Sequence, residues 1–206
     1  VEVLLADVVG VARAQLYGQN PDRRLFPTQQ KRLKSLLWRR KAGEPVAYLL
    51  GRQEFWSISL EVTPAVLIPR PETELLVQHL LETITPDRHK IADLGTGSAA
   101  ISVALAIARP DWQLVATDYS RAALRVAERN VRYYKLKNIE LRWGNWCQAL
   151  LAGEKFAAII SNPPYVNAES MAQLPQEYRH EPQNALASGI DGLDATHLIL
   201  QQAALH

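Results

Sequence analysis

The chain has 206 residues, 48% of them hydrophobic, and a formal net charge of +2. That length suits one large domain, or a medium and a small one. The near-neutral charge excludes a general electrostatic reason to bind nucleic acid or a membrane. The longest apolar run, residues 99–108, is shorter than the roughly 20 residues that span a bilayer.

The single cysteine, Cys147, excludes an internal disulfide. It fits a reducing compartment, so we expect a cytoplasmic protein. No secretory signal is visible, and the sequence starts at Val1 and ends at His206 within helix-like or apolar residues. We therefore expect a fragment of a longer protein.

Residues 1–45 are predicted to form a small helical domain. The first helix has one apolar face, made of Leu4, Leu5, Val8 and Val11. Pro21 and Pro27 interrupt the chain, and Thr28 is a candidate N-cap for a second helix that stops at Gly43. The inward face of that helix is expected to carry Leu33, Leu36 and Leu37.

A run of basic residues without an acidic one spans residues 23–41. It consists of Arg23, Arg24, Lys31, Arg32, Lys34, Arg39, Arg40 and Lys41. Such a run is typical of a solvated helix face. It can also dock an acidic or nucleic-acid-bound partner, and both interpretations stay open.

Residues 46–72 are predicted to be extended. Residues 56–62 alternate apolar and polar side chains, as a half-buried strand does. Residues 63–65 can turn the chain, so residues 66–68 are expected to return as the partner strand of a hairpin. Pro69-Arg70-Pro71 then ends it.

Strand and helix patterns alternate from residue 73 onward, which predicts a parallel sheet with helices on both faces. The strands are expected at residues 90–94, 113–117, 139–142 and 156–161. The helices are expected near residues 73–80, 99–108 and 120–134. Because such sheets bind ligands at the carboxyl ends of their strands, the chemistry is expected just after each strand.

A glycine-rich segment, Asp93-Leu94-Gly95-Thr96-Gly97, ends the first of these strands. Glycines let the backbone turn tightly and approach a ligand at a helix N-terminus. The spacing also matches a dinucleotide fingerprint. However, the Asp93 carboxylate would oppose a pyrophosphate and suits the cationic S-adenosylmethionine. Since no hydride-transfer constellation is visible, we favour S-adenosylmethionine over NAD.

Two later strand ends add candidate cofactor contacts. Asp118 can accept hydrogen bonds from both ribose hydroxyls of an adenosine cofactor, or it can begin a turn with Ser120. Asn145 and Trp146 can face an adenine through a hydrogen bond and stacking. Core packing explains Trp146 equally well.

The segment Asn162-Pro163-Pro164-Tyr165 follows the last strand and is the most distinctive in the chain. Because proline has no N–H, the two prolines present carbonyl acceptors on a stiff backbone. The asparagine adds a further acceptor and the tyrosine a flat ring. Together they suit a planar –NH2 group held through both hydrogens. A plain strand-ending turn is the alternative.

These motifs together resemble those of the HemK/PrmC family, the N5-glutamine methyltransferases that modify peptide chain release factors. Further matching segments are Gly43-Glu44-Pro45, Tyr48-Leu49-Leu50-Gly51, Glu54-Phe55-Trp56, Leu67-Ile68-Pro69-Arg70-Pro71-Glu72-Thr73-Glu74 and Asp191-Gly192-Leu193-Asp194. The resemblance implies an α/β fold, with a class I S-adenosylmethionine-dependent methyltransferase (Rossmann-like) domain at residues 73–206. It also implies a helical substrate-docking domain at residues 1–45 and a connecting β-hairpin at residues 46–72.

The resemblance further implies methyl transfer from S-adenosylmethionine to the glutamine of a release factor's Gly-Gly-Gln motif. With the two additions from the strand ends, the expected cofactor contacts are Asp93, Gly95, Thr96, Gly97, Asp118, Asn145, Trp146 and Asn162. The implied substrate contacts are Asn162, Pro163, Pro164 and Tyr165.

We hypothesise that the Asn162 side-chain oxygen and the Pro163 carbonyl accept the two amide hydrogens, while Tyr165 packs on the amide plane. Positioning would then supply most of the rate enhancement, and no general base is evident. Of the carboxylates considered, Glu72 and Glu74 are expected to favour a helix N-terminus. Glu181 is the third carboxylate that we considered as a general base.

The chain departs from the family pattern in three places. Ala99 stands where the family usually has a third glycine, and Asn145 stands where many members are acidic. The family sheet continues through a fifth, sixth and seventh strand beyond the position of His206. The C-terminal strands are therefore expected to be missing.

Two other functions stay open. One is amino-methylation of adenine or cytosine in nucleic acid, because the same Asn-Pro-Pro-Tyr surface suits an exocyclic amine. The other is an inactive fragment that binds a protein. We expect a monomer without nucleic-acid substrate, membrane partner or metal. The residues that lack metal-ligand spacing are His79, His89, His180, His197, His206 and Cys147.

Overall fold

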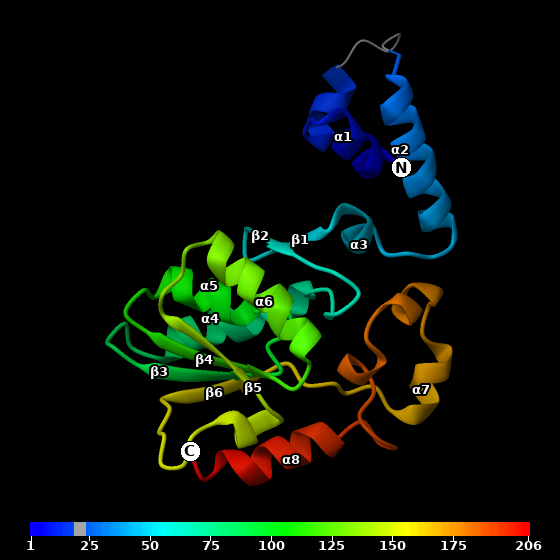
Figure 1. Ribbon diagram of the computed structural model, residues 1–206. Helices are drawn as coiled ribbons and strands as arrows, with labels where there is room; N and C mark the ends of the chain where they lie inside the picture. The colour runs from blue at the N-terminus through cyan, green and yellow to red at the C-terminus, as the bar shows by residue number, and fades with distance from the viewer. Residues whose placement is uncertain (19–23) are drawn as a thin grey trace. The chain divides into compact units, whose positions relative to one another are not determined.

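The computed structural model describes residues 1–18 and 24–206. In that part, the chain divides into two compact units, Val1–Gly51 and Arg52–His206, whose elements are labelled in Figure 1. Pro21 and Arg23, predicted as a chain break and as part of the basic run, lie outside the described residues. No helix within the described ranges is long and apolar enough to cross a membrane.

The first unit is helical, as predicted. Its helices are α1 (Glu2–Val9), α2 (Pro27–Lys41) and α3 (Val46–Leu50), and a short 3-10 helix spans Arg13–Gly18. Its buried centre consists of Leu4, Val8, Leu36 and Leu49. Leu33 and Leu37 pack against that centre. Gly43, with φ 90°, follows the end of α2 and confirms the predicted stop.

Three details of the first unit differ from the prediction. Val11 lies beyond the end of α1. Helix α2 begins at Pro27, before Thr28, because the fixed φ of proline and its missing N–H suit the first position of a helix. Residues 46–50, expected to be extended, form α3, which buries Leu49 in the centre of the unit.

The hairpin uses other residues than predicted. Strand β1 (Arg52–Phe55) pairs antiparallel with β2 (Ile58–Glu61), and residues 66–68 are not a strand. Trp56 and Ser57 form the turn with φ of 52° and 58°, the left-handed pair that matches strand twist in a two-residue hairpin. The apolar side chains that the hairpin buries in the core of the second unit are Phe55, Ile58 and Leu60. Each such burial stabilises by about 2 kcal/mol.

The second unit contains the predicted parallel sheet. In the described residues its strands are β3 (Lys90–Leu94), β4 (Gln113–Asp118), β5 (Ile139–Trp143) and β6 (Ala158–Ser161), in the order β5-β4-β3-β6. All neighbouring pairs are parallel. Strand β6 begins later than the predicted residue 156. Strands beyond His206 stay a prediction.

Helices precede, connect and follow these strands. They are α4 (Glu74–Thr83), α5 (Ala100–Ala108), α6 (Arg121–Tyr133), α7 (Ala168–Gln173) and α8 (Asp194–Ala203). Short 3-10 helices span Pro71–Thr73, Trp146–Ala149, Gln176–His180 and Gln183–Ala185. The predicted N-cap of α6 is confirmed, because the Ser120 hydroxyl accepts a hydrogen bond from the Ala123 N–H.

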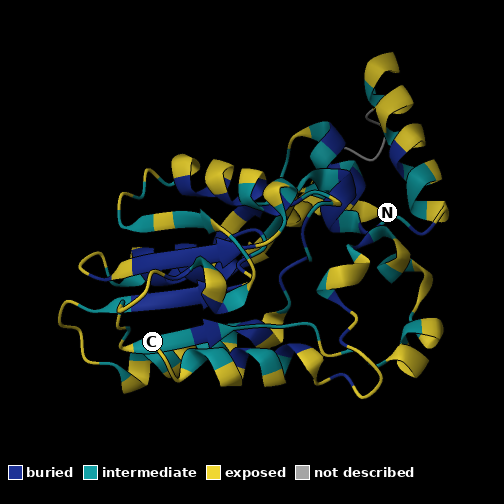
Figure 2. Cartoon of the chain, turned by 60° about the horizontal axis from the view of Figure 1, so that its bottom comes forward, coloured by how far each residue is buried: buried dark blue, intermediate teal, exposed yellow. Residues whose placement is uncertain are grey.

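Helices α4, α5 and α6 cover one face of the sheet and α8 covers the other (Figure 1). Successive residues of β3 point to opposite faces, so Ile91 packs in the core under α4–α6, and Ala92 packs with Ile199 of α8. The central strands β3 and β4 are buried along most of their length (Figure 2). The prediction of helices on both faces is confirmed.

An ion-pair network joins β3 and β5 through the loop before β6. Glu154 accepts hydrogen bonds from Lys90 at 2.5 Å and from Arg142 at 2.7 and 3.0 Å. The backbone N–H of Leu151 donates to the same carboxylate. These donors, the Arg142 guanidinium first among them, hold the pKa of Glu154 well below its usual range.

Replacement of this carboxylate tests the network. We expect Glu154→Gln to lower the free energy of unfolding by about 2 kcal/mol at pH 7, as loss of hydrogen bonds to a charged group does. Because the folded pKa of Glu154 is lowered, its contribution is present above about pH 4.5 and is lost as the pH falls toward the folded pKa. Urea unfolding at pH 7 and at low pH measures the difference.

The matched control is Glu128→Gln. Glu128 makes an ion pair with Arg132, in which both side chains are largely exposed (75% for Arg132 and 48% for Glu128, against 12% for Glu154). Its loss should cost no more than about 0.5 kcal/mol. Equal costs for the two variants would refute the role given to Glu154.

Candidate functional site

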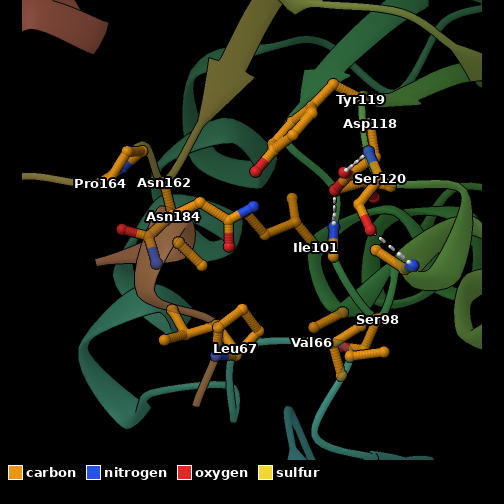
Figure 3. Close-up of a pocket in the computed structure, with 18 of the residues that line it drawn as sticks. Val66, Leu67, Ser98, Ile101, Asp118, Tyr119, Ser120, Asn162, Pro164 and Asn184 are labelled. Carbon is orange, nitrogen blue, oxygen red and sulfur yellow. Dashed lines mark hydrogen bonds between the residues drawn. The ribbon is translucent and has the colours of Figure 1, made fainter. Parts of the chain in front are cut away.

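A cavity opens at the carboxyl ends of the parallel strands in the second unit (Figure 3). It holds about 980 Å³ of empty space, counting the part open to solvent. In the sheet, β4 and β6 flank β3 on opposite sides. The connections of the chain diverge there, and open α/β sheets bind ligands at such a point.

Most of the predicted site residues meet in this cavity. Those that line it are Gly95, Thr96, Gly97, Asp118, Asn145, Trp146, Asn162 and Pro164. Asn162 and Pro164 lie on one side of it, and Asp118 lies on the other (Figure 3). Asp93, Pro163 and Tyr165 are not among the lining residues.

The Asp118 carboxylate organises the glycine-rich loop. Its two oxygens accept hydrogen bonds from the N–H of Gly97 at 2.9 Å and of Ser120 at 2.8 Å. Both oxygens keep a further lone pair for a ligand. Burial raises the pKa of Asp118 above its ordinary value, and the two backbone N–H groups lower it in part.

Asp93 supports the same loop from below the cavity. One oxygen accepts hydrogen bonds from the hydroxyls of Thr96 and Ser102, both at 2.6 Å. The other oxygen is buried without a donor among the described residues. Burial raises the pKa of this carboxyl, and the two hydroxyls lower it in part. The predicted cofactor contact of Asp93 stays a prediction.

The indole of Trp146 lies against Gly95 of the glycine-rich loop. A Cβ placed on Gly95 would lie 3.1 Å from the Trp146 ring, and φ at Gly95 is +70°, so this position admits only a glycine without strain. Trp146 itself has φ of 47°. A left-handed conformation at a bulky residue is costly and clusters at functional sites. The ring also packs against the core under α8, which agrees with the core-packing interpretation, and the adenine contact of Trp146 stays a prediction.

The Asn162 carboxamide is oriented by a residue from a distant part of the chain. Its Nδ2 donates to the Thr73 hydroxyl at 3.2 Å. Its Oδ1 accepts no hydrogen bond from any residue that the structure describes. The neighbouring Ser161 hydroxyl donates to the Leu94 carbonyl at 2.7 Å and ties β6 to β3. An amide acceptor is thereby presented beside the cavity.

Tyr165 follows the lining residue Pro164 in the chain, and 67% of its surface is exposed. Its backbone is held by the loop at residues 189–192. A Cβ on Gly192 would lie 2.4 Å from the Tyr165 carbonyl oxygen. Next in the chain after Tyr165, Val166 is held by two backbone hydrogen bonds. Its N–H donates to the Leu186 carbonyl, and its carbonyl accepts from the Ser188 N–H. The segment Asp191-Gly192-Leu193-Asp194 thus supports the Asn-Pro-Pro-Tyr motif.

Two walls of the cavity were not predicted from the sequence. One consists of Ala65, Val66, Leu67 and Pro69, and the second consists of Pro182, Asn184 and Ala185. Glu181 joins them, because its buried carboxylate accepts from the Ile68 N–H at 3.0 Å and from Arg70 at 2.6 Å. Further unpredicted lining residues are Thr73, Ser98, Ala100, Ile101, Tyr119, Ser120, Ala123 and Gly144.

The carboxylates considered as bases have other partners or are exposed. Glu74 accepts the Trp56 N–H at 2.8 Å and stabilises the hairpin turn. Glu181 is fixed in its ion pair, and Glu72 is exposed. In the described ranges, no group of three or more His, Cys, Asp or Glu side chains could hold a metal ion.

Family models match both units of the chain. The model of the Methyltransferase small domain matches residues 71–189. The model of the PrmC N-terminal domain matches residues 1–51. Both matches agree with the motifs that the sequence analysis identified.

Curated relatives match nearly the whole chain. It is 47% identical over 203 residues to the release factor glutamine methyltransferase of Coxiella burnetii (strain RSA 493 / Nine Mile phase I), a match that covers 98% of this chain and 72% of the relative. Identity to the enzyme of the same name from Escherichia coli (strain K12) is 41% over 203 residues, covering 97% and 72% of the two chains.

Among solved structures, the catalytic domain of hMettl16 in complex with MAT2A 3′UTR hairpin 6 has a similar fold. The TM-score is 0.56 at 17% sequence identity, over 90% of this chain and 67% of that chain. At this identity the likeness shows the fold alone.

The ionised Asp118 carboxylate is expected to control cofactor affinity. We expect Asp118→Asn to weaken binding of S-adenosylhomocysteine by roughly 10- to 100-fold, as loss of hydrogen bonds to a charged acceptor does. In the unchanged protein, protonation of Asp118 should weaken binding as the pH falls. Because its pKa is raised, this loss should begin at a higher pH than the roughly 3.9 of an exposed aspartate. Isothermal titration calorimetry between about pH 8 and pH 5 measures both effects.

The control for this experiment is Asp111→Asn, an exposed aspartate before β4 at the opposite end of the sheet. The affinity of the Asp111→Asn variant for S-adenosylhomocysteine, and the pH dependence of that affinity, should match those of the unchanged protein. An Asp118→Asn variant with unchanged affinity would contradict the assignment.

The contact between Gly192 and Tyr165 predicts a steric cost at Gly192. Alanine at Gly192 (φ +87°) meets both backbone strain and the Tyr165 carbonyl. Alanine at Gly153 (φ +80°) meets the strain alone, because apart from its chain neighbours no atom of the described residues lies within 4 Å. The strain costs about 1–2 kcal/mol. We expect Gly192→Ala to destabilise the protein by at least about 1 kcal/mol more than Gly153→Ala in urea unfolding. Equal costs would show that the contact does not constrain Tyr165.

Proposed function

We propose a function from one premise: the chain belongs to the release factor glutamine methyltransferase family. This membership confirms the predicted family and the class I methyltransferase fold. The chain is an S-adenosylmethionine-dependent methyltransferase. It transfers a methyl group to the side-chain amide nitrogen (N5) of the glutamine in the Gly-Gly-Gln motif of peptide chain release factors.

The cavity fits S-adenosylmethionine, which supplies a methyl group on a positively charged sulfur. The bare backbone of Gly95 and Gly97 would allow close approach. The Asp118 carboxylate would accept hydrogen bonds from ribose hydroxyls, and Trp146 would border the adenine. The negative charges of Asp93 and Asp118 complement a cationic ligand, and the buried Asp93 oxygen that has no donor among the described residues favours such a ligand further.

The observation that carries the substrate assignment is the orientation of Asn162. Thr73 occupies its Nδ2, so the Oδ1 acceptor is available to one hydrogen of a substrate amide. The Pro163 carbonyl would accept the second hydrogen, because neither Pro163 nor Pro164 has an N–H and their backbone therefore offers only acceptors. Two acceptors at fixed positions would aim the nitrogen at the methyl group.

Positioning is the main contribution that these residues can make. An amide nitrogen is a poor nucleophile because its lone pair is delocalised, and methyl transfer requires in-line approach. Holding the two groups in line can contribute several kcal/mol to lowering the barrier. Glu74 and Glu181 are engaged elsewhere, so the proton would pass to solvent after transfer. The exposed Tyr165 ring would cover the amide plane.

The class of substrate, the oligomeric state and the cellular location of the chain are inferred from this function. We propose that the substrate is the protein and not nucleic acid, because the family match extends through the helical first unit. We propose that the chain acts as a monomer in the cytoplasm, where release factors act. The first unit, with the basic side chains of α2, would dock the release factor.

Mass spectrometry of a release factor incubated with this chain and S-adenosylmethionine tests the proposal. One added methyl on the Gly-Gly-Gln glutamine is the expected result. We expect Asn162→Ala to lower the rate at saturating cofactor by roughly 30- to 1,000-fold, or about 2–4 kcal/mol, as loss of one preorganised polar contact does. A DNA duplex in a parallel reaction should stay unmodified.

Asn167→Ala is the matched control, because Asn167 caps α7 and does not line the cavity. Its rate should stay within about threefold of the unchanged chain. Near-normal turnover by Asn162→Ala would refute the role of Asn162. Methylated DNA with an unmodified release factor would refute the assignment of the release factor as the substrate.

A further inference from the structure

Asn130 is a buried polar residue on α6 that the mechanism above does not use. Only 3% of its surface is exposed. Within the described residues, its carboxamide makes hydrogen bonds to the backbone of two separate segments. Oδ1 accepts from the Glu61 N–H at 2.7 Å. Nδ2 donates to the Glu61 carbonyl at 3.0 Å and to the Ser98 carbonyl at 2.9 Å.

The orientation of this carboxamide follows from its partners. The Glu61 N–H can only donate, so it requires Oδ1, and the two carbonyls can only accept, so they require Nδ2. The donors and the acceptor of Asn130 are therefore all engaged. A buried amide with every group paired is rigid, whereas loss of one partner leaves buried backbone groups unsatisfied.

Both segments held by Asn130 lead into walls of the cofactor cavity. Glu61 ends β2 and precedes the segment that contributes Ala65, Val66 and Leu67. Ser98 belongs to the glycine-rich loop and borders the cavity (Figure 3). One side chain thus connects the hairpin to the cofactor loop. The nearby ion pair of Arg129 with Glu61 is largely exposed and can hold these segments only weakly.

The hydrogen bond to Ser98 acts at the strained point of the loop. The Ser98 carbonyl belongs to the peptide unit that precedes Ala99, whose φ is +64°. A left-handed alanine persists only where its surroundings determine it. Asn130 supplies such a constraint, because turning this peptide unit would break the hydrogen bond to Ser98.

We propose that Asn130 is a positioning residue for the cofactor site: it holds the left-handed turn at Ala99 and the segment after β2 in the geometry that binds S-adenosylmethionine. The inference rests on the proposed function, because it assigns the cavity to that cofactor. Asn130 does not line the cavity and acts through Ser98 and Glu61.

Asn130→Ala is the first variant, and the probe is S-adenosylhomocysteine alone, measured by isothermal titration calorimetry. We expect its affinity to fall by roughly 10-fold or more, the size expected for unpairing buried backbone groups. In methyl transfer to a release factor, the KM for S-adenosylmethionine should rise by a similar factor. The kcat at saturating cofactor should stay within about threefold.

Asn138→Ala separates positioning from general destabilisation. The Asn138 side chain also donates to three backbone carbonyls, those of Ala106, Pro110 and Trp112, at 3.4, 3.4 and 3.1 Å. These lie at the opposite end of the sheet, away from the cavity. We expect Asn138→Ala to lower the unfolding temperature and to keep the affinity within about twofold. Should Asn130→Ala fail to fold, Asn130→Asp preserves the volume and the acceptor for Glu61, and it should show the same loss of affinity.

Ala99→Gly tests whether Asn130 acts through the loop. Glycine adopts a positive φ without strain, so the loop should need Asn130 less. The loss of affinity caused by Asn130→Ala should therefore be smaller in the Ala99→Gly background than in the unchanged chain. A loss of equal size in both backgrounds would overturn the action through Ala99.

Folded Asn130→Ala with unchanged affinity, or an equal loss in Asn138→Ala, would overturn the inference. Binding of S-adenosylhomocysteine by the unchanged chain without methylation of a release factor would overturn the proposed substrate alone and leave the role of Asn130 intact. Absence of binding by the unchanged chain would overturn both.

Discussion

The pairing of β3 with a parallel strand on each side is the constraint on which the rest of the structure depends. Backbone hydrogen bonding places β4 and β6 on opposite sides of β3. All three strands therefore end at the same edge of the sheet. The loops that follow them must diverge, and their divergence creates the cavity. The glycine-rich loop, Asp118 and the Asn-Pro-Pro-Tyr segment share one site because of this pairing.

Buried polar contacts between distant segments then fix the shape of the cavity. Thr73 orients Asn162, Glu181 joins Arg70 and Ile68, and Asn130 links Glu61 to Ser98. Each contact pairs a buried polar group, whether of the backbone or of a side chain, that would otherwise be unsatisfied. The walls are therefore positioned before any ligand binds, which is what a reaction that depends on alignment requires.

The same contacts explain what the sequence could not predict. Residues 66–68 look like a strand because they are apolar, but Glu181, and not a neighbouring strand, holds the Ile68 N–H. Strand β1 has a mainly polar sequence at the edge of a two-stranded sheet, so it lacks the alternation that reveals a strand. Asn130 lies in an amphipathic helix rich in charged side chains, where an asparagine normally faces solvent.

The sequence by itself determined the parallel strands β3 to β6 and helices α4, α5 and α6 of the second unit, the family, and which side chains follow the strand ends. These features depend on local periodicity and on short motifs, so neighbouring residues suffice to define them. Only the tertiary structure decided which distant polar groups pair: Asn162 with Thr73, and Asn130 with Ser98. The burial of Thr73 and Asn130 favours these pairings, and burial depends on how the whole chain packs.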